Sequence, residues 1–224
     1  MRNIVYGVFG FALLAGSVWS GASVSARQAD MVKTHIGHVM TSFTDTPNSQ
    51  GLLATALAEA KTAAEHVALA EKAANDLLFP LKAREAMVLH AGHVIHAIDP
   101  SVEPTGPGLN YGVKKAAAGI AQHIGLAAKA QGASKNVITY AAHVSASANN
   151  VVKRSDELVA LAQKVREAVT ATEMVRYVDQ LTAKAKQLVA GVDANKDGKI
   201  TWEPGEGGLQ QVEMEMQLML KEGS

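Results

Sequence analysis

The sequence predicts an all-α protein, a helical bundle of about five to six helices with a further helix-loop-helix at its C-terminal end. Alanine and other residues of high helix propensity are abundant, and aromatic residues make up only 4% of the chain. No segment alternates apolar and polar residues as a half-buried strand does. Apolar residues instead recur at intervals of three and four, which places them on one face of a helix.

The helices follow one another with recognisable start signals. Pro80 suits the first turn of a helix that runs to Ile98. Ser134 can cap the long helix that follows it, and Thr170 with Glu173 forms a capping box for the next. The expected helices cover residues 28–42, 51–78, 80–98, 113–131, 135–169 with a bend that could lie near 149–150, a segment beginning after 170, and 209–221.

Residues 99–111 form an expected loop rich in proline and glycine. Its length exceeds the 2–8 residues typical of connections in a compact bundle. Such a loop is either functional or a rigid crossover, and both interpretations remain open at this level.

Residues 1–26 are typical of a secretory signal peptide. Met1 and Arg2 give a short basic start, an uncharged apolar run continues to Trp19, and small residues end at Ala26. The apolar run is shorter than the roughly 20 residues that cross a bilayer. We therefore expect an exported, periplasmic or extracellular protein without stable membrane insertion after cleavage, whose residues 27–190 form the histidine-containing bundle.

Composition excludes several functional classes. The chain has no cysteine, so disulfides, thiolate metal sites and covalently attached c-type haem are excluded. It carries 21 basic and 21 acidic side chains and no basic run, which gives no electrostatic basis for binding nucleic acid. Metal ions are the expected partners, and no protein partner can be named from the sequence.

An oxygen-rich segment near the C-terminus suits a hard cation such as calcium. Asp193, Asn195 and Asp197 alternate along it, so their side-chain oxygens would converge on one side of a tight loop. Gly198 supplies the sharp turn that follows, and Ile200 would tie the loop to the flanking helices. An Asx-rich turn that binds no ion is the alternative.

This segment resembles the calcium loop of the EF-hand family. The resemblance implies a backbone carbonyl ligand from Lys199 and a side-chain or water-mediated ligand from Thr201. Pro204 occupies the twelfth position, where the family has a bidentate Glu, so Glu206, or alternatively Glu203, would close the site. Without the usual closing ligand, we expect weak calcium binding, with a Kd on the order of 10⁻⁴–10⁻³ M. The implied EF-hand-like helix-loop-helix covers residues 171–222 and packs on the bundle.

All eight histidines lie in expected helices, where a bundle can bring side chains of several helices together. Residues 86–98 carry no formal charge, and His90, His93 and His96 share the face opposite the main apolar stripe. A helix that is uncharged all round is usually buried. Buried imidazoles require hydrogen-bond partners or a metal ion. The sequence therefore predicts a metal site that uses some of these three histidines.

Histidines of other helices could complete that site. His123 lies on the apolar stripe of its helix, and His35 and His66 border apolar stripes, whereas His38 points away and is expected to be solvated. Imidazole coordination suits Zn²⁺, Cu²⁺, Ni²⁺ or Co²⁺. Two inward histidines, or one with Met87, could hold haem. A hydrogen-bonded histidine core or a pH-responsive surface is the alternative.

Together these patterns predict an exported calcium-binding helical protein with one divergent, structural EF-hand-like site. The alternative is a periplasmic protein that binds or buffers a transition metal or haem with the bundle histidines. A helical interaction module that binds no ion is a further alternative. An enzyme is less expected, because the chain has neither a Gly-x-Ser-x-Gly nucleophile turn nor a phosphate-binding glycine loop.

Overall fold

The computed structural model describes residues 21–76 and 80–221. Over these residues the protein is helical and contains no strand, which confirms the all-α prediction. The elements in chain order are α1 (Gly21–Met40), a 3₁₀ turn (Pro47–Ser49), α2 (Leu52–Ala74), α3 (Pro80–Ile98), α4 (Val113–Lys129), α5 (Lys135–Glu167), α6 (Ala171–Ala190) and α7 (Leu209–Lys221).

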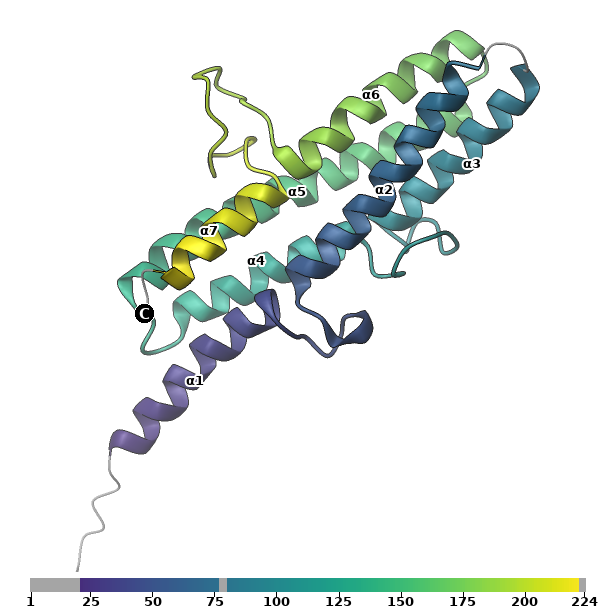
Figure 1. The fold of residues 1–224 in the computed structure, drawn as a ribbon. Coiled ribbons are helices and arrows are strands. Elements are labelled where there is room, and N and C mark those ends of the chain that lie inside the picture. The colour runs from purple at the N-terminus through teal and green to yellow at the C-terminus, as the bar shows by residue number, and fades with distance from the viewer. Residues whose placement is uncertain (1–20, 77–79, 222–224) are drawn as a thin grey trace, which may run out of the picture.

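The long helix α5 organises the bundle. It packs against α3, α4, α6 and α7, while α2 packs against α3, α4 and α6 (Figure 1). Helices α6 and α7 follow one another along α5, and the segment 191–208 leaves the bundle between them. Helix α1 lies at one end of the bundle and packs mainly against α4, with a smaller contact to α2. In the described part of the chain no helix combines the length and hydrophobicity that a bilayer crossing requires.

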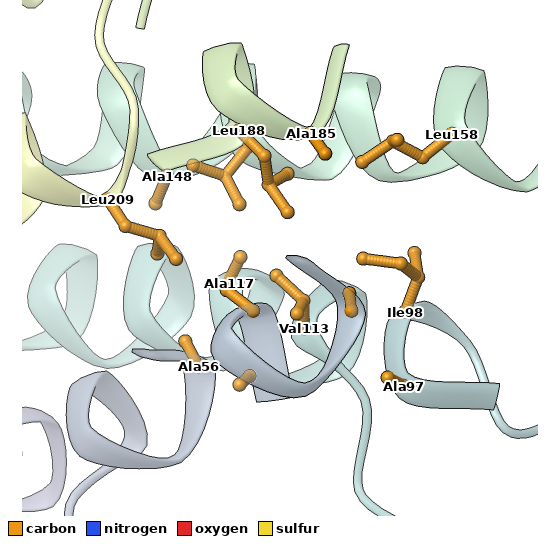
Figure 2. Packing of buried hydrophobic residues seen from close by; sticks show 14 of the residues in the cluster. Ala56, Ala97, Ile98, Val113, Ala117, Ala148, Leu158, Ala185, Leu188 and Leu209 are labelled. Carbon is orange, nitrogen blue, oxygen red and sulfur yellow. The ribbon is translucent and has the colours of Figure 1, made fainter. Parts of the chain in front are cut away.

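The core is built from small and branched apolar side chains. Figure 2 shows Leu158, Ala185 and Leu188 of α5 and α6 facing Ile98 and Val113 of α3 and α4, and all five side chains are buried. Alanines at many of the contact positions let the helix backbones approach closely, and dispersion contacts between aliphatic side chains fill the space between them.

The predicted cap residues occupy the positions expected of them. The Ser134 hydroxyl accepts the backbone N–H of Val137, and Thr170 and Glu173 form the reciprocal capping box at the start of α6. Helix α5 is continuous through Asn149 and Asn150. Helix α2 ends earlier than expected, at Ala74, because the Asn75 side chain turns back to the carbonyl of Glu71 and caps the last turn. The predicted signal peptide lies outside the described residues as far as position 20, and positions 21–26 form the beginning of α1.

A buried carboxylate fixes the long crossover between α3 and α4. Glu59 of α2 has no exposed surface, and its carboxylate accepts the backbone N–H groups of Leu109, Tyr111 and Gly112 at 2.9–3.1 Å. Tyr111 in turn donates its hydroxyl to Asp45 at 2.9 Å. The Tyr111–Gly112 end of the loop, which begins α4, is therefore held to α2, as expected of a rigid crossover.

Candidate metal centres

One cluster of histidines joins α1 to α4. His35 and His38 lie one turn apart on α1, and His123 faces them from α4. The Nδ1 atom of His123 lies 3.0 Å from Nδ1 of His35 and 3.2 Å from Nδ1 of His38. The three residues offer one ring nitrogen each within 4.8 Å of one another. We call this group the first triad.

A second cluster has the same plan and lies in the α2–α3 hairpin. His90 and His93 are one turn apart on α3, and His66 faces them from α2. The Nδ1 atom of His66 lies 3.0 Å from Nδ1 of His90 and 3.4 Å from Nδ1 of His93. These three residues also offer one ring nitrogen each within 4.8 Å of one another, and we call this group the second triad.

Hydrogen bonding among the rings cannot satisfy either triad well. A neutral imidazole nitrogen carries either one proton or one in-plane lone pair, whereas the central Nδ1 of each triad has two Nδ1 neighbours at hydrogen-bond distance. A cation that accepts all three lone pairs removes this conflict. Zinc–nitrogen bonds of 2.0–2.1 Å in a tetrahedral site place the ligand nitrogens about 3.3 Å apart, close to the 3.0–3.4 Å observed between the central Nδ1 of each triad and its two neighbours.

The electrostatic environment keeps these imidazoles in the form that binds metals. Burial, with a further contribution from neighbouring imidazoles, lowers the pKa of five triad histidines. They are His35, His66, His90, His93 and His123. A lowered pKa leaves the ring neutral at physiological pH, with a lone pair available for a cation.

The structure groups the histidines differently from the single site that the sequence predicted. His90 and His93 meet His66, but His96 belongs to neither triad. Its Nδ1 faces the backbone carbonyl of Glu103 at 2.8 Å, and the side chain is only 2% exposed. This is the ordinary arrangement of a buried histidine with a backbone partner. His96 therefore ties the long crossover to α3.

His123 and His38 differ from the sequence prediction in another way. His123 was expected to complete the site on α3 but lies in the first triad, because α4 packs against α1 and α2 while barely meeting α3. His38 was expected to be solvated, yet it faces α4 beside His35. A sequence signal for His38 does exist: residues 35–40 and 90–95 share the pattern His-x-Gly-His-Val-x.

The two triads lie far apart along the bundle. Helices α2 and α4 run antiparallel, because Leu52 contacts Gly119 while Glu59 reaches Gly112. Counting 1.5 Å per residue along these helices from those contacts, His66 and His123 are separated by about 27 Å. Dinuclear centres hold their ions about 4 Å apart, so each triad can hold only an ion of its own.

The oxygen-rich segment forms a compact loop between α6 and α7. The Asp193 carboxylate accepts the backbone N–H groups of Asp197 and Gly198 at 3.1 and 2.9 Å. The side chains of Asn195 and Asp197 accept backbone N–H groups two residues further on. Gly198 adopts a φ of +86°, the left-handed conformation that a sharp turn requires. The three predicted oxygen ligands thus line one short, exposed loop.

Glu206 is placed differently from Glu203, the other candidate for closing this loop. Glu206 is 1% exposed, and its Oε2 accepts the backbone N–H and the hydroxyl of Thr201 at 2.9 and 2.7 Å. Its Oε1 is buried without a hydrogen-bond partner among the described residues. The Thr201 hydroxyl is the main cause that lowers the pKa of Glu206, which is therefore ionised. Glu203 is exposed, and among the described residues its carboxylate accepts the side-chain amide of Asn195.

Helix α5 anchors the exit of the loop. The Arg154 guanidinium donates to the backbone carbonyls of Gly205, Glu206 and Gly207. One turn away, Asn150 donates to the carbonyl of Glu203 and accepts the N–H of Gly205 at 2.9 Å. The carboxylate of Glu206 is thereby held in place by the bundle.

Trp202 provides a further contact between the loop and the bundle. Its indole stacks on the imidazole of His143, with ring centroids 4.2 Å apart and planes 4° from parallel. His143 Nδ1 lies 3.1 Å from the carboxylate of Glu215 on α7. His143 thus sits between the loop and α7, apart from both triads.

The fold and these sites define a helical bundle with two three-histidine clusters and one oxygen-lined loop. Comparison of the chain with protein-family models, curated proteins and solved structures found no match.

Proposed function

We propose that this chain is a transition-metal-binding protein that takes up two ions, one at each triad. The observation that carries the proposal is the convergence of one ring nitrogen from each of three histidines in each triad within 4.8 Å, with the central Nδ1 only 3.0–3.4 Å from the Nδ1 atoms of its two neighbours. The lowered pKa of the rings supports the same conclusion, because metal ions compete with protons for imidazole nitrogens.

Imidazole ligands favour divalent ions of borderline softness, namely Zn²⁺, Cu²⁺, Ni²⁺ and Co²⁺. Haem fits these clusters less well. Two axial nitrogens on opposite sides of a haem iron lie about 4 Å apart with the macrocycle between them. The shortest Nδ1–Nδ1 distance in each triad is 3.0 Å.

The separation of the triads favours binding and buffering of ions over chemistry at a dinuclear centre. Counted at 1.5 Å per residue along the helices, the two mononuclear sites lie about 27 Å apart. Two ions at this distance cannot act on one substrate together. The leader-like residues 1–26 favour an exported location for this activity. We therefore propose metal buffering outside the cytoplasm.

Metal content tests this function directly. The chain should be purified from its native compartment without a metal-affinity tag or chelator, and bound metals measured by elemental mass spectrometry. Two equivalents of a transition metal are expected, falling to one in His66→Ala and in His35→Ala. His143→Gln, which removes a histidine outside the triads, should retain two. A chain that is free of transition metal and takes none up on titration with Zn²⁺ or Cu²⁺ would refute the proposal.

Calcium binding at the α6–α7 loop is a second candidate function. The specific observation that favours it is the buried, unpartnered Oε1 of the ionised Glu206, below a loop lined by Asp193, Asn195 and Asp197. A buried carboxylate oxygen without a partner costs free energy unless a cation or water meets it. We propose Glu206 as the closing ligand of a weak site, with Lys199 and Thr201 as further ligands.

Calcium-dependent thermal stabilisation tests this site. Millimolar calcium should raise the Tm of the wild-type chain, and Asp193→Ala and Glu206→Gln should abolish the increase. Glu203→Gln is the matched control, because it removes a neighbouring carboxylate that is exposed. An unchanged calcium response in Asp193→Ala would show that the loop does not bind the ion.

A further inference from the structure

The two triads differ in what they connect. The first triad joins residues 85 and 88 positions apart in the sequence, on helices that are not consecutive. The second triad joins residues only 24 and 27 positions apart, within one helical hairpin. An ion at the first triad would therefore be a long-range cross-link, and an ion at the second triad a local one.

Helix α1 has few other attachments to the bundle. Among its described side chains only Val32 and Val39 are buried, and Ile36 and Met40 are partly buried against the core. The helix lies at one end of the molecule and packs mainly against α4, with a smaller contact to α2 (Figure 1). The ordering of a helix costs conformational entropy at every residue, so a contact that adds an ion to this small interface has a large effect on docking.

The first triad is also the more enclosed of the two. Phe43, just beyond α1, packs its ring 4.7 Å from the ring of His123 and 4.9 Å from that of His38. A compact turn holds Phe43 there, since its backbone N–H donates to the carbonyl of Gln50. His123 is itself buried while His35 and His38 are partly exposed, whereas all three residues of the second triad are partly exposed. Enclosure of this kind slows the access of water and competing ligands to an ion.

The second triad lies beside open space, in a hairpin whose two helices are also packed together by buried apolar side chains. Ala63, Val67 and Ala70 of α2 and Val94 of α3 are buried in the core. His90 also forms part of the wall of an open hollow of about 450 Å³, together with Leu69, Lys72, Asn75 and Ala86. An incoming ligand can therefore approach this triad while the hairpin stays packed.

We propose that the two sites divide the work: the first triad holds a structural ion that fastens α1 to the bundle, and the second triad holds the ion that exchanges with the surroundings. This division rests on the proposed function, because it requires both triads to bind metal. Under this proposal, the packing of α1 on the bundle depends on metal, and the α2–α3 hairpin provides the buffering capacity.

The test combines metal release with hydrogen exchange on the full chain. The protein is loaded with two equivalents of Zn²⁺ and mixed with excess 4-(2-pyridylazo)resorcinol, and release is followed by absorbance. Two phases of one equivalent each, at least tenfold apart in rate, are expected. His90→Ala should remove the fast phase and His123→Ala the slow phase, with His35→Ala as a second variant should His123→Ala fail to fold.

Amide exchange of residues 31–40, followed by mass spectrometry, reports the docking of α1. Removal of zinc should speed this exchange at least tenfold in the wild-type chain and in His90→Ala, and should change little in His35→Ala. Gly37→Ala is the matched control, because an added Cβ there meets only the Thr41 hydroxyl at 3.5 Å. It raises helix propensity without touching a ligand, so the zinc dependence should persist.

Two results would contradict the assignment of separate roles to the triads while leaving metal binding intact. One is an equal rate of zinc release from both triads, and the other is amide hydrogen exchange in α1 that does not change when zinc is removed. Failure of the loaded chain to hold two equivalents would instead overturn the proposed function, and the division with it. The stoichiometry measured before mixing separates these cases.

Discussion

Metal binding at the two triads should stabilise the folded state by an amount that follows from the occupancy of each site. One ion that binds the folded state alone stabilises it by RT ln(1 + [L]/Kd), which is about 2.7 kcal/mol at a free concentration of 100 times Kd. Sites about 27 Å apart, as the helical rise places them, are expected to contribute additively. With free Zn²⁺ at 100 times the Kd of both triads, the two ions should therefore stabilise the chain by about 5.4 kcal/mol.

The expected shift in Tm follows from the size of the domain. For 150–250 residues, 1 kcal/mol corresponds to about 2–4 °C, so each occupied triad should raise the Tm by about 5–11 °C. His123→Ala and His66→Ala should each lose half of the zinc-induced shift, and the double variant should lose all of it. His143→Gln should keep the full shift. Thermal unfolding followed by circular dichroism, with and without saturating zinc, measures these differences.

Two outcomes would refute this reasoning. If either single variant lost the whole shift, the triads would be coupled rather than independent. If the double variant kept the wild-type shift, zinc would be bound elsewhere and the triads would have no part in it. Each variant is compared by its zinc-induced change in Tm rather than by its absolute Tm. This comparison cancels the loss of stability that the substitution causes in the metal-free state.

Four further predictions concern the metal-free bundle and the loop. Because the pKa of the five triad histidines is lowered, the metal-free folded state takes up their protons at lower pH than the unfolded chain. Stability should be greatest above the ordinary histidine pKa of about 6.5 and decline as the pH falls below it, so urea midpoints should be higher at pH 7.5 than at pH 5. Calcium should change the emission of Trp202 in a chain that lacks residues 1–26 and with them Trp19, and Glu206→Gln should abolish that response. Arg154→Ala should destabilise the protein by about 3 kcal/mol in urea titrations, since it strips a charged donor from three backbone carbonyls; a loss below 1 kcal/mol would contradict the anchoring role. Glu59→Gln should cost about 2–3 kcal/mol by the same measurement, since an amide cannot accept three backbone N–H groups as a carboxylate does, and an unchanged midpoint would contradict this.

Local chemistry made much of the fold predictable from the sequence. Pro80 and Ile98 bound α3 as expected, and the Thr170 capping box starts α6, because these signals act within one or two turns. The alanine stripes made the helices themselves predictable. They did not show which helices pack together, because small apolar faces pack almost equally well on many partners. The pairing of α1 with α4 was therefore not predictable.

The histidine sites were predictable only in part, for the same reason. The participation of His90 and His93 in one cluster follows from their spacing on a single helix. Their meeting with His66 requires knowledge of how α2 faces α3. The position of His38 was misjudged because the sequence pattern identified only the face of α1 that packs on the core and not its border with α4. The repeated His-x-Gly-His-Val pattern was the available signal.

That repeated pattern also bears on how such proteins can change over evolutionary time. Each triad combines two histidines from a four-residue stretch of one helix with one histidine from a neighbouring helix. A pair of histidines on one helix would hold an ion only weakly. A single substitution to histidine on the neighbouring helix would complete a three-ligand site. Capacity for metal can thus be gained or lost one residue at a time, while the alanine-rich interior that specifies the bundle is left untouched.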